Sequence, residues 1–514
     1  MTNASKDSLF ILIKSLSKSE KRQFKLYVNR LGVNANAKFL ALFNLLDKLK
    51  KYDEPTILKS EIVKKQQLSN LKAHLYKQIL VSLRLNPVNQ DIRIQLREQL
   101  DFATILYQKG LYKQSLKILD KAKNMALENQ EKNLAYEVIE LEKIIESQYI
   151  TRSISGRADE LAIQAKELSQ KNVIASKLSN LSLQLYGLML KMGYAKSDEE
   201  ITEITNYFNA RLPEYQIEAL DFREKLWVYK SHLWYSFLIQ DFLSCYKYAT
   251  KWVDMFYENP SMIYLNPVWF LKGNNYLLEC LQLVKYSSYF KTALERLEAT
   301  IALPEFPNNE NVQSLSFIYI YNNKFNLHFM EGNFVEGAYL IEETQELLKN
   351  HQNAIDEHHV MIFYYKIACM YFGMENHKMC IKFLKKIIDN KNLTMREDLM
   401  CFARVLSLVA HYEAGMDYHL DVQLRSTYKF LIKMNDLHAV QKEMIKFLRN
   451  LGNIYPHELK GEFIKLRDRL KQYEDHRYEK RAFLYLDIIS WLESNIQNRP
   501  VAEIIKEKAQ RDFR

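Results

Sequence analysis

The clearest hydrophobic pattern in the chain lies between Gln99 and Ala122. Apolar residues recur at helical spacing on both sides of Gly110, at Phe102, Ile105, Leu106, Tyr112, Leu116 and Leu119. Glycine readily adopts the left-handed conformation that ends a helix, so Gly110 is a natural turn between two helices. The pattern predicts an antiparallel pair of helices, which cannot bury its apolar faces by itself.

Small residues stand where these two helices must approach closely. Together with two leucines, they resemble the packing positions of one tetratricopeptide repeat: Ala103, Leu106, Ser115, Leu119 and Ala122. Leu127 stands where that motif usually has proline. The resemblance implies that further hairpins stack on this one.

Comparable patterns follow one another along most of the chain. The turns within these hairpins are expected near Gly110, Ser155, Gly193, Asp241, Ser288, Gly332, Glu375, Gly415 and Tyr455. The mean step of about 43 residues is close to that of helical repeat families, although a standard tetratricopeptide unit has about 34. We therefore expect an all-α fold in which residues 91–475 form a right-handed α-solenoid of tetratricopeptide-like hairpins. This pattern resembles uncharacterised bacterial proteins of the same architecture, which implies no activity.

Residues 1–90 do not follow the hairpin pattern. Ser17 and Glu20 have the spacing of a capping box, which predicts a helix from there to about Leu31. Gly32 and the following Asn-Ala-Asn-Ala stretch are expected to break it. Further helices are predicted over residues 39–49, 55–64 and 68–85. The segment is therefore expected to be a small helical bundle.

Charge separates this bundle from the rest of the chain. Residues 1–90 hold 17 of the 72 Lys and Arg residues and 6 of the 62 Asp and Glu residues, a net charge of +11, whereas residues 91–514 have −1. The excess positive charge thus belongs to the N-terminal bundle, and the two parts are expected to meet different partners.

The last segment, residues 476–514, is expected to contain capping helices. A long helix is predicted through Ile496, and Pro500 begins a charged final helix. Repeat arrays need polar terminal caps of this kind.

Composition favours long helices in a soluble protein. The 514 residues include 12 Gly and 9 Pro, and 48% are hydrophobic. No apolar run has the length of a signal-peptide core or a membrane span, so we expect a cytoplasmic protein. The five cysteines show no CxxC pairing and are expected to be buried free thiols: Cys245, Cys280, Cys369, Cys380 and Cys401.

The sequence contains no phosphate loop, nucleophile elbow or zinc-protease motif. The best metal-ligating candidates are His351, Asp356, Glu357, His358 and His359. Carboxylates are also favoured electrostatically in the first turn of a helix, which explains Asp356 and Glu357 without a metal. A weaker set lies around a later turn, at His411, Glu413, Asp417 and His419. We expect no enzyme activity, no cofactor and no metal.

A row of aromatic and polar residues lies on the first helices of the middle hairpins. The resemblance implies that four positions of each such helix face a concave groove, and alignment on the turns places eight candidates there: Trp227, Lys230, Trp234, Asn275, Tyr319, Asn322, Asn326 and Tyr365. In this repeat class, asparagine amides hold the backbone of an extended peptide and lysines hold its carboxylates. Asparagine is mildly unfavourable within a helix, and its amide both donates and accepts. The first hypothesis is a scaffold that binds a peptide or protein; alternatively, these residues face water or bond neighbouring helices.

The basic bundle allows a second hypothesis. The helices predicted over residues 55–64 and 68–83 could form a helix-turn-helix that presents Ser69, Asn70, Lys72, His74 and Lys77 to DNA. No glycine or other small residue marks the turn between them, and a row of lysines is more often a solvated face. The alternative is therefore a nucleic-acid-binding regulator with a repeat domain as its sensor. The oligomeric state does not follow from the sequence.

Overall fold

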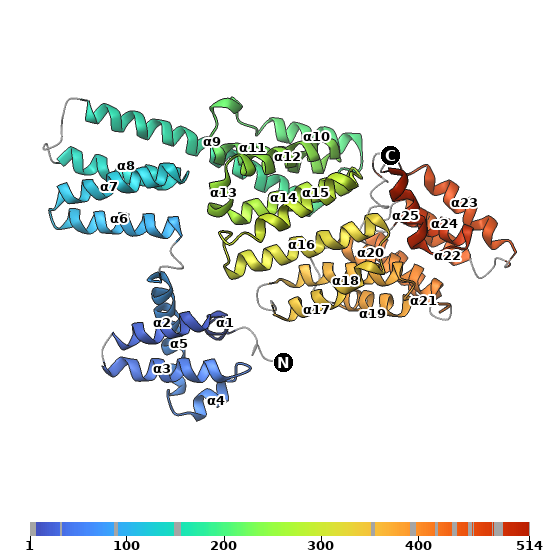
Figure 1. Cartoon of the computed structure of the whole chain (residues 1–514), viewed down its shortest axis with the longest axis horizontal. Helices are drawn as coiled ribbons and strands as arrows, with labels where there is room; N and C mark the ends of the chain where they lie inside the picture. The colour runs from blue at the N-terminus through green and yellow to red at the C-terminus, as the bar shows by residue number, and fades with distance from the viewer. Residues whose placement is uncertain are drawn as a thin grey trace. The chain divides into compact units, whose positions relative to one another are not determined.

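The computed structural model describes residues 7–30, 33–86, 91–148, 156–350, 355–390, 397–416, 420–433, 439–450, 455, 457–474, 476, 478 and 487–512. Every regular element in these residues is helical and none is a strand, so the predicted all-α class is confirmed (Figure 1). Within the same residues, none of the helices combines the length and apolar content that crossing a membrane requires.

The chain divides into two compact units, Met1–Asn172 and Val173–Arg514, and the division falls inside one long helix, α9. The predicted boundaries after residues 90 and 475 fall at residues outside the described part of the chain, and they stay predictions. The helices up to this point are α1 Ser8–Ser15, α2 Lys18–Asn29, α3 Val33–Lys48, α4 Glu54–Lys59, α5 Lys65–Arg84, α6 Ile92–Gln108, α7 Tyr112–Glu128, α8 Lys132–Gln148 and α9 Arg157–Met192.

Helices α1 to α5 share one hydrophobic core, in which Leu9, Phe24, Phe43 and Leu75 are buried. The predicted capping box is confirmed. The Ser17 hydroxyl accepts a hydrogen bond from the Glu20 backbone N–H at 3.2 Å, and the Glu20 carboxylate accepts one from the Ser17 N–H at 2.8 Å.

The predicted break over the Asn-Ala-Asn-Ala stretch is wrong for those four residues. They belong to α3, which begins at Val33, whereas Gly32 lies outside the described residues. The helical penalty of an asparagine is a fraction of 1 kcal/mol, which is small beside the burial of Leu42, Phe43 and Leu46 on the same helix.

The hairpin α6–α7 packs through the small residues that the sequence indicates. Ala103, Ser115 and Ala122 are fully buried, and the Ser115 hydroxyl donates a hydrogen bond to the Ala103 carbonyl at 2.8 Å. Leu119 is also buried, whereas Leu106 is half-buried. The two helices therefore approach closely along this line, and α8 extends the same core.

The second unit continues with α10 Asp198–Asn209, η3 Ile217–Ala219, α11 Phe222–Leu238, α12 Phe242–Glu258, α13 Pro260–Leu265, α14 Pro267–Leu283, α15 Ser287–Ile301, α16 Glu310–Glu331, η4 Glu336–Ala338, α17 Tyr339–Asn350, α18 Glu357–Gly373, α19 His377–Ile388, α20 Glu397–Glu413, α21 Leu420–Lys433, α22 Ala439–Asn450, α23 Leu459–Lys471, α24 Ile488–Gln497 and α25 Val501–Asp512. Consecutive helices pack in pairs, such as α11 with α12 and α18 with α19. In addition, α14 contacts α16, α16 contacts α18, and α18 contacts α20.

One turn geometry recurs between consecutive helices of both units. A residue with positive φ is followed by a residue whose N–H bonds to the carbonyl five positions earlier, at 2.8 to 3.0 Å. This is the Schellman arrangement, which satisfies carbonyls at the end of a helix. The positive-φ residues are Gly110, Gln130, Gln240, Lys285, Gly332, Glu375 and Gly415. The predicted turns at Gly110, Gly332, Glu375 and Gly415 are thus confirmed, and Ser155 lies outside the described residues.

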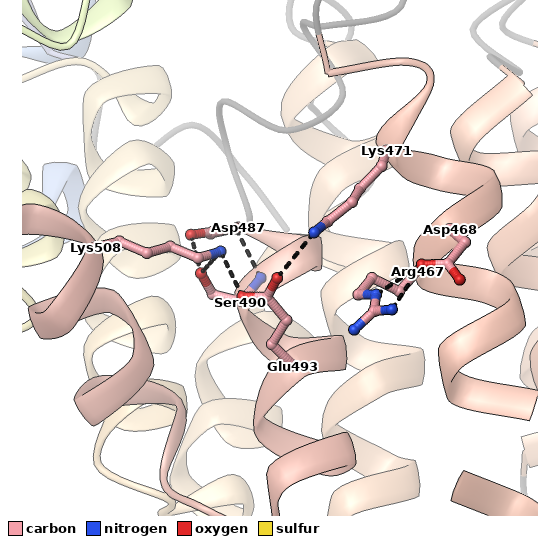
Figure 2. A network of polar contacts seen from close by, with 7 residues as sticks. All are labelled: Arg467, Asp468, Lys471, Asp487, Ser490, Glu493 and Lys508. Atoms are coloured by element: carbon pink, nitrogen blue, oxygen red, sulfur yellow. Dashed lines mark hydrogen bonds and ion pairs between the residues drawn. The ribbon is translucent and has the colours of Figure 1, made fainter. Parts of the chain in front are cut away.

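The C-terminal helix α25 returns to the middle of the second unit. It packs against α16, and a Cβ atom at Gly332 would lie 2.7 Å from the Ala502 carbonyl oxygen. Figure 2 shows polar side chains that join α24 to α23 and to α25. The Glu493 carboxylate pairs with Lys508 at 2.9 Å and with Lys471 at 3.5 Å, so one acidic side chain joins three helices.

All five cysteines are free thiols, as predicted. Cys245, Cys280, Cys380 and Cys401 are buried, whereas Cys369 is half-buried.

Candidate functional site

Two lysines and two tryptophans from α11 and α14 form the first part of the site, which we call the Lys–Trp cluster: Trp227, Lys230, Trp269 and Lys272. The two indole rings meet edge to face, with centroids 5.2 Å apart. The Lys230 ammonium lies 4.7 Å from the Trp227 centroid and 4.6 Å from that of Trp269, and the Lys272 ammonium lies 5.9 Å from the Trp269 centroid. All four side chains are half-buried.

Electrostatics within this cluster are unfavourable to the two ammonium groups. Burial lowers the pKa of Lys230 to about 8, with a smaller contribution from the positive charge of Lys272. Burial also lowers the pKa of Lys272. Within the described part of the chain, neither ammonium group has a hydrogen-bond acceptor or an ion-pair partner. The tryptophan rings are the favourable partners that these cations have there.

The second part of the site is a chain of side-chain amides across α14, α16 and α18, which we call the Asn–Lys ladder: Asn275, Asn323, Asn326 and Lys366. The Asn323 amide donates to the Asn275 side-chain oxygen at 3.0 Å and to the Tyr319 carbonyl at 2.7 Å. The Asn326 amide donates to the Asn323 oxygen at 3.4 Å, and the Lys366 ammonium donates to the Asn326 oxygen.

One donor of the ladder and one acceptor beside it on α16 have no partner among the described residues. Among the described residues, the amide nitrogen of Asn275 has no acceptor, and the buried side-chain oxygen of Asn322 has no donor. A buried polar group without a partner costs about 1–3 kcal/mol, so the Asn322 oxygen calls for an explanation.

Lys366 ends the ladder in an apolar environment. Burial lowers the pKa of Lys366 to about 8, although the charge of Glu279 on α14 acts in the opposite direction. Its ammonium also lies 5.8 Å from the Phe329 ring centroid. On the same helix, burial raises the pKa of Cys369 to about 12, so this thiol is protonated at neutral pH.

Three of the residues predicted for the groove are buried among neighbouring helices. Trp234 packs against Tyr186 and Tyr276, with ring centroids 4.9 and 5.6 Å away. Burial raises the pKa of Tyr319 to about 12, and Tyr365 is likewise buried. These three aromatic side chains pack between helices, whereas Trp227, Lys230, Asn275, Asn322 and Asn326 are half-buried.

Four residues of the two groups were not among the sequence candidates: Trp269, Lys272, Asn323 and Lys366. Three of them lie near one that was. Asn323 follows Asn322, Lys366 follows Tyr365, and Lys272 precedes Asn275 by about one helical turn. Helical spacing from the predicted Asn275 could have suggested Lys272, but a shift of one residue along a helix turns a side chain by about 100°. Only the packed helices decide which of two neighbours faces the next helix.

The residues predicted for nucleic-acid binding lie on α5, where they divide into two groups. Ser69, Asn70, His74 and Lys77 are exposed. Lys72, by contrast, pairs with the Asp7 carboxylate and donates to the Tyr52 hydroxyl at 2.9 Å. Burial lowers the pKa of Lys72, but these hydrogen bonds outweigh it, and the pKa lies above its ordinary value. Lys72 therefore joins helices of the bundle.

The metal candidates have structural roles where they are described. Asp356 caps α18, because its carboxylate accepts a hydrogen bond from the His359 backbone N–H at 3.0 Å. Glu413 accepts hydrogen bonds from Trp491 and Asn495, at 2.5 and 2.9 Å. His351, Asp417 and His419 lie outside the described residues. The described residues contain no group of three or more potential ligands that could hold a metal ion.

No protein-family model, no curated protein and no solved structure matches the chain.

Proposed function

We propose that this chain is a non-enzymatic binding protein, in which stacked helical hairpins form an α-solenoid and hold an extended peptide or partner protein along their first helices. Two features of the second unit support the repeat architecture. The same Schellman turn recurs between paired helices, and the first helices α14, α16, α18 and α20 contact one another in order. Both are expected where similar hairpins stack.

The Asn–Lys ladder is the observation that carries the proposal. Its asparagines lie inside helices, where this residue is disfavoured, and they occur on two adjacent first helices. A peptide backbone presents one donor and one acceptor per residue. The unused donor of Asn275 is complementary to the acceptors of such a backbone.

A peptide-display selection tests this function. Peptides enriched on the wild-type protein are then measured against the double variant Asn322→Ala with Asn326→Ala. Loss of two hydrogen bonds at about 1 kcal/mol each should weaken binding roughly 10- to 30-fold. The matched control is Asn180→Ala, since Asn180 is an exposed residue within α9. Thermal unfolding of every variant must show that the fold is retained. Equal binding by the double variant, or no enrichment at all, would count against the proposal.

Nucleic-acid binding by the N-terminal bundle is the second candidate. It is favoured by the net charge of +11 over residues 1–90 and by the exposure of Ser69, Asn70 and Lys77 on one helix. Exposed lysines can contact phosphates without reading sequence.

A further inference from the structure

The Lys–Trp cluster contains two positive charges that nothing in the described part of the chain neutralises. Three other buried or half-buried lysines have polar partners. Lys123 pairs with Glu142 at 3.0 Å, Lys72 pairs with Asp7, and Lys366 donates to Asn326. Lys230 and Lys272 have no such partner among the described residues. We infer that the Lys–Trp cluster is a binding site for a phosphoryl group, held between the ammonium groups of Lys230 and Lys272.

The first step of the inference concerns the cost of the unpaired charges. A cation removed from water loses hydration, and an aromatic face returns only about 0.5–2 kcal/mol. Trp227 and Trp269 thus hold the ammonium groups in place without neutralising them. The positive charge of Lys272 repels that of Lys230. One anion placed between them would attract both ammonium groups and offset this repulsion.

The second step concerns the kind of anion. A carboxylate carries one negative charge and would leave one ammonium group uncompensated. A phosphate monoester carries about −1.5 to −2 at pH 7 and offers three acceptor oxygens. Lysine binds phosphate as a compact point charge, whereas planar carboxylates are matched best by the fork of an arginine. Two lysines without an arginine therefore favour a phosphoryl group.

The third step concerns access. All four side chains of the cluster are half-buried, so part of each lysine remains accessible to a ligand. Partial burial also reduces screening by water, which strengthens the attraction between the ligand and the two ammonium groups. The inference does not depend on peptide binding by the Asn–Lys ladder, because the cluster shares no residue with it. The phosphoryl group can belong to a small ester or to a phosphorylated side chain of a partner.

Calorimetric titration of the full chain tests the inference with inorganic phosphate, O-phosphoserine and acetate at constant ionic strength. We expect phosphate and phosphoserine to bind and acetate to bind at least tenfold more weakly. Lys272→Met and Lys230→Met should each weaken phosphoserine binding at least tenfold. The matched control is Lys251→Met. Lys251 is exposed on α12 and lies outside the cluster, and its ammonium group is 6.0 Å from the Tyr229 ring centroid. Equal affinities in all four proteins, or acetate binding as tight as that of phosphate, would overturn the inference.

Thermal unfolding supplies a second readout. Phosphate stabilises many proteins through exclusion from their surface, and this effect acts on every variant alike. Specific binding should add a further increase in the melting temperature of the wild type and of Lys251→Met. The additional increase should be absent from Lys272→Met. If Lys230→Met fails to fold, Lys272→Met alone decides the outcome, since the loss of either cation removes the pair.

The source of the phosphoryl group is decided by a further comparison. A serine peptide and its phosphorylated form are titrated beside free O-phosphoserine. Tighter binding of the phosphopeptide than of free phosphoserine indicates a phosphorylated partner, whereas equal binding indicates a small phosphate ester. In either case the unphosphorylated peptide should bind at least tenfold more weakly at this cluster. Asn326→Ala should leave phosphoserine binding unchanged, which separates failure of this site from failure of the ladder.

Discussion

The ammonium group of Lys366 on α18 donates a hydrogen bond to the side-chain oxygen of Asn326 on α16, across 40 residues of sequence. The contact joins a half-buried charge to a chain of amides that reaches Asn275 on α14. It therefore links α14, α16 and α18 through polar side chains, in a unit with a large hydrophobic core.

The lowered pKa of Lys366 predicts a pH dependence of stability. The pKa of Lys366 in the folded chain is about 8, below the ordinary value of 10.5. Between these two pH values, Lys366 is protonated in the unfolded chain but has lost its proton in the folded chain. The contribution of Lys366 to the free energy of unfolding must therefore rise as the pH increases from about 8 to about 10.5. Relative to Lys366→Met, the urea midpoint of the wild type should be higher at about pH 9.5 than at about pH 7.5.

The comparison with Lys366→Met removes the titration of other groups, since tyrosines and exposed lysines are common to both proteins. Lys385→Met is a suitable control, because Lys385 is exposed on α19. The prediction would be contradicted if the difference in urea midpoint between the wild type and Lys366→Met stayed constant or fell between the two pH values.

The polar contacts in Figure 2 predict unequal effects for two carboxylates. Glu493 is 15% exposed and pairs with lysines from α23 and α25, so Glu493→Gln should reduce the free energy of unfolding by about 1–2 kcal/mol. Asp468 is 58% exposed and pairs with its sequence neighbour Arg467. Asp468→Asn should therefore change the free energy of unfolding by less than about 0.5 kcal/mol. Denaturant unfolding checks both values, and similar losses for the two variants would count against the stated role of Glu493.

Two glycines within helices should respond in opposite directions to alanine. A Cβ atom at Gly273 of α14 would lie 2.7 Å from the Trp252 indole nitrogen, so Gly273→Ala should destabilise the protein by about 1–3 kcal/mol. Gly187 of α9 is exposed, and its Cβ would meet nothing within 4 Å. Gly187→Ala should therefore stabilise by roughly 0.5–1 kcal/mol through helix propensity. Chemical denaturation measures both, and a loss of stability in Gly187→Ala would be unexpected.

The nucleic-acid alternative predicts different effects for substitutions at two lysines of α5. Labelled duplex DNA should bind the full chain with an affinity that falls steeply with salt, and Lys77→Ala should reduce the salt slope by about 1. Lys72→Met should instead lower the stability of the bundle, because Lys72 pairs with Asp7. The control is Lys117→Ala, since Lys117 is exposed on α7. Absence of DNA binding at low salt would remove this candidate.

Local features of the fold could be predicted well. The capping box at Ser17 and the turns at Gly110 and Gly332 depend on residues within one or two helical turns, so their geometry follows from nearby side chains. The exception, the start of α3, shows that distant burial can outweigh a local preference. The return of α25 to Gly332 had no counterpart in the sequence pattern, because the contact joins segments far apart in the chain.

The sequence by itself determined that this protein is built from helices, where many of them turn, and that excess positive charge lies in residues 1–90. Hydrophobic periodicity and helix-ending residues are local signals, which explains this success. Tertiary structure alone decided that Asn323 bonds to Asn275, that Lys366 completes the ladder, and that Lys230 meets Trp269. These contacts depend on the rotation of each packed helix about its axis, which a helical period by itself leaves uncertain by about one residue.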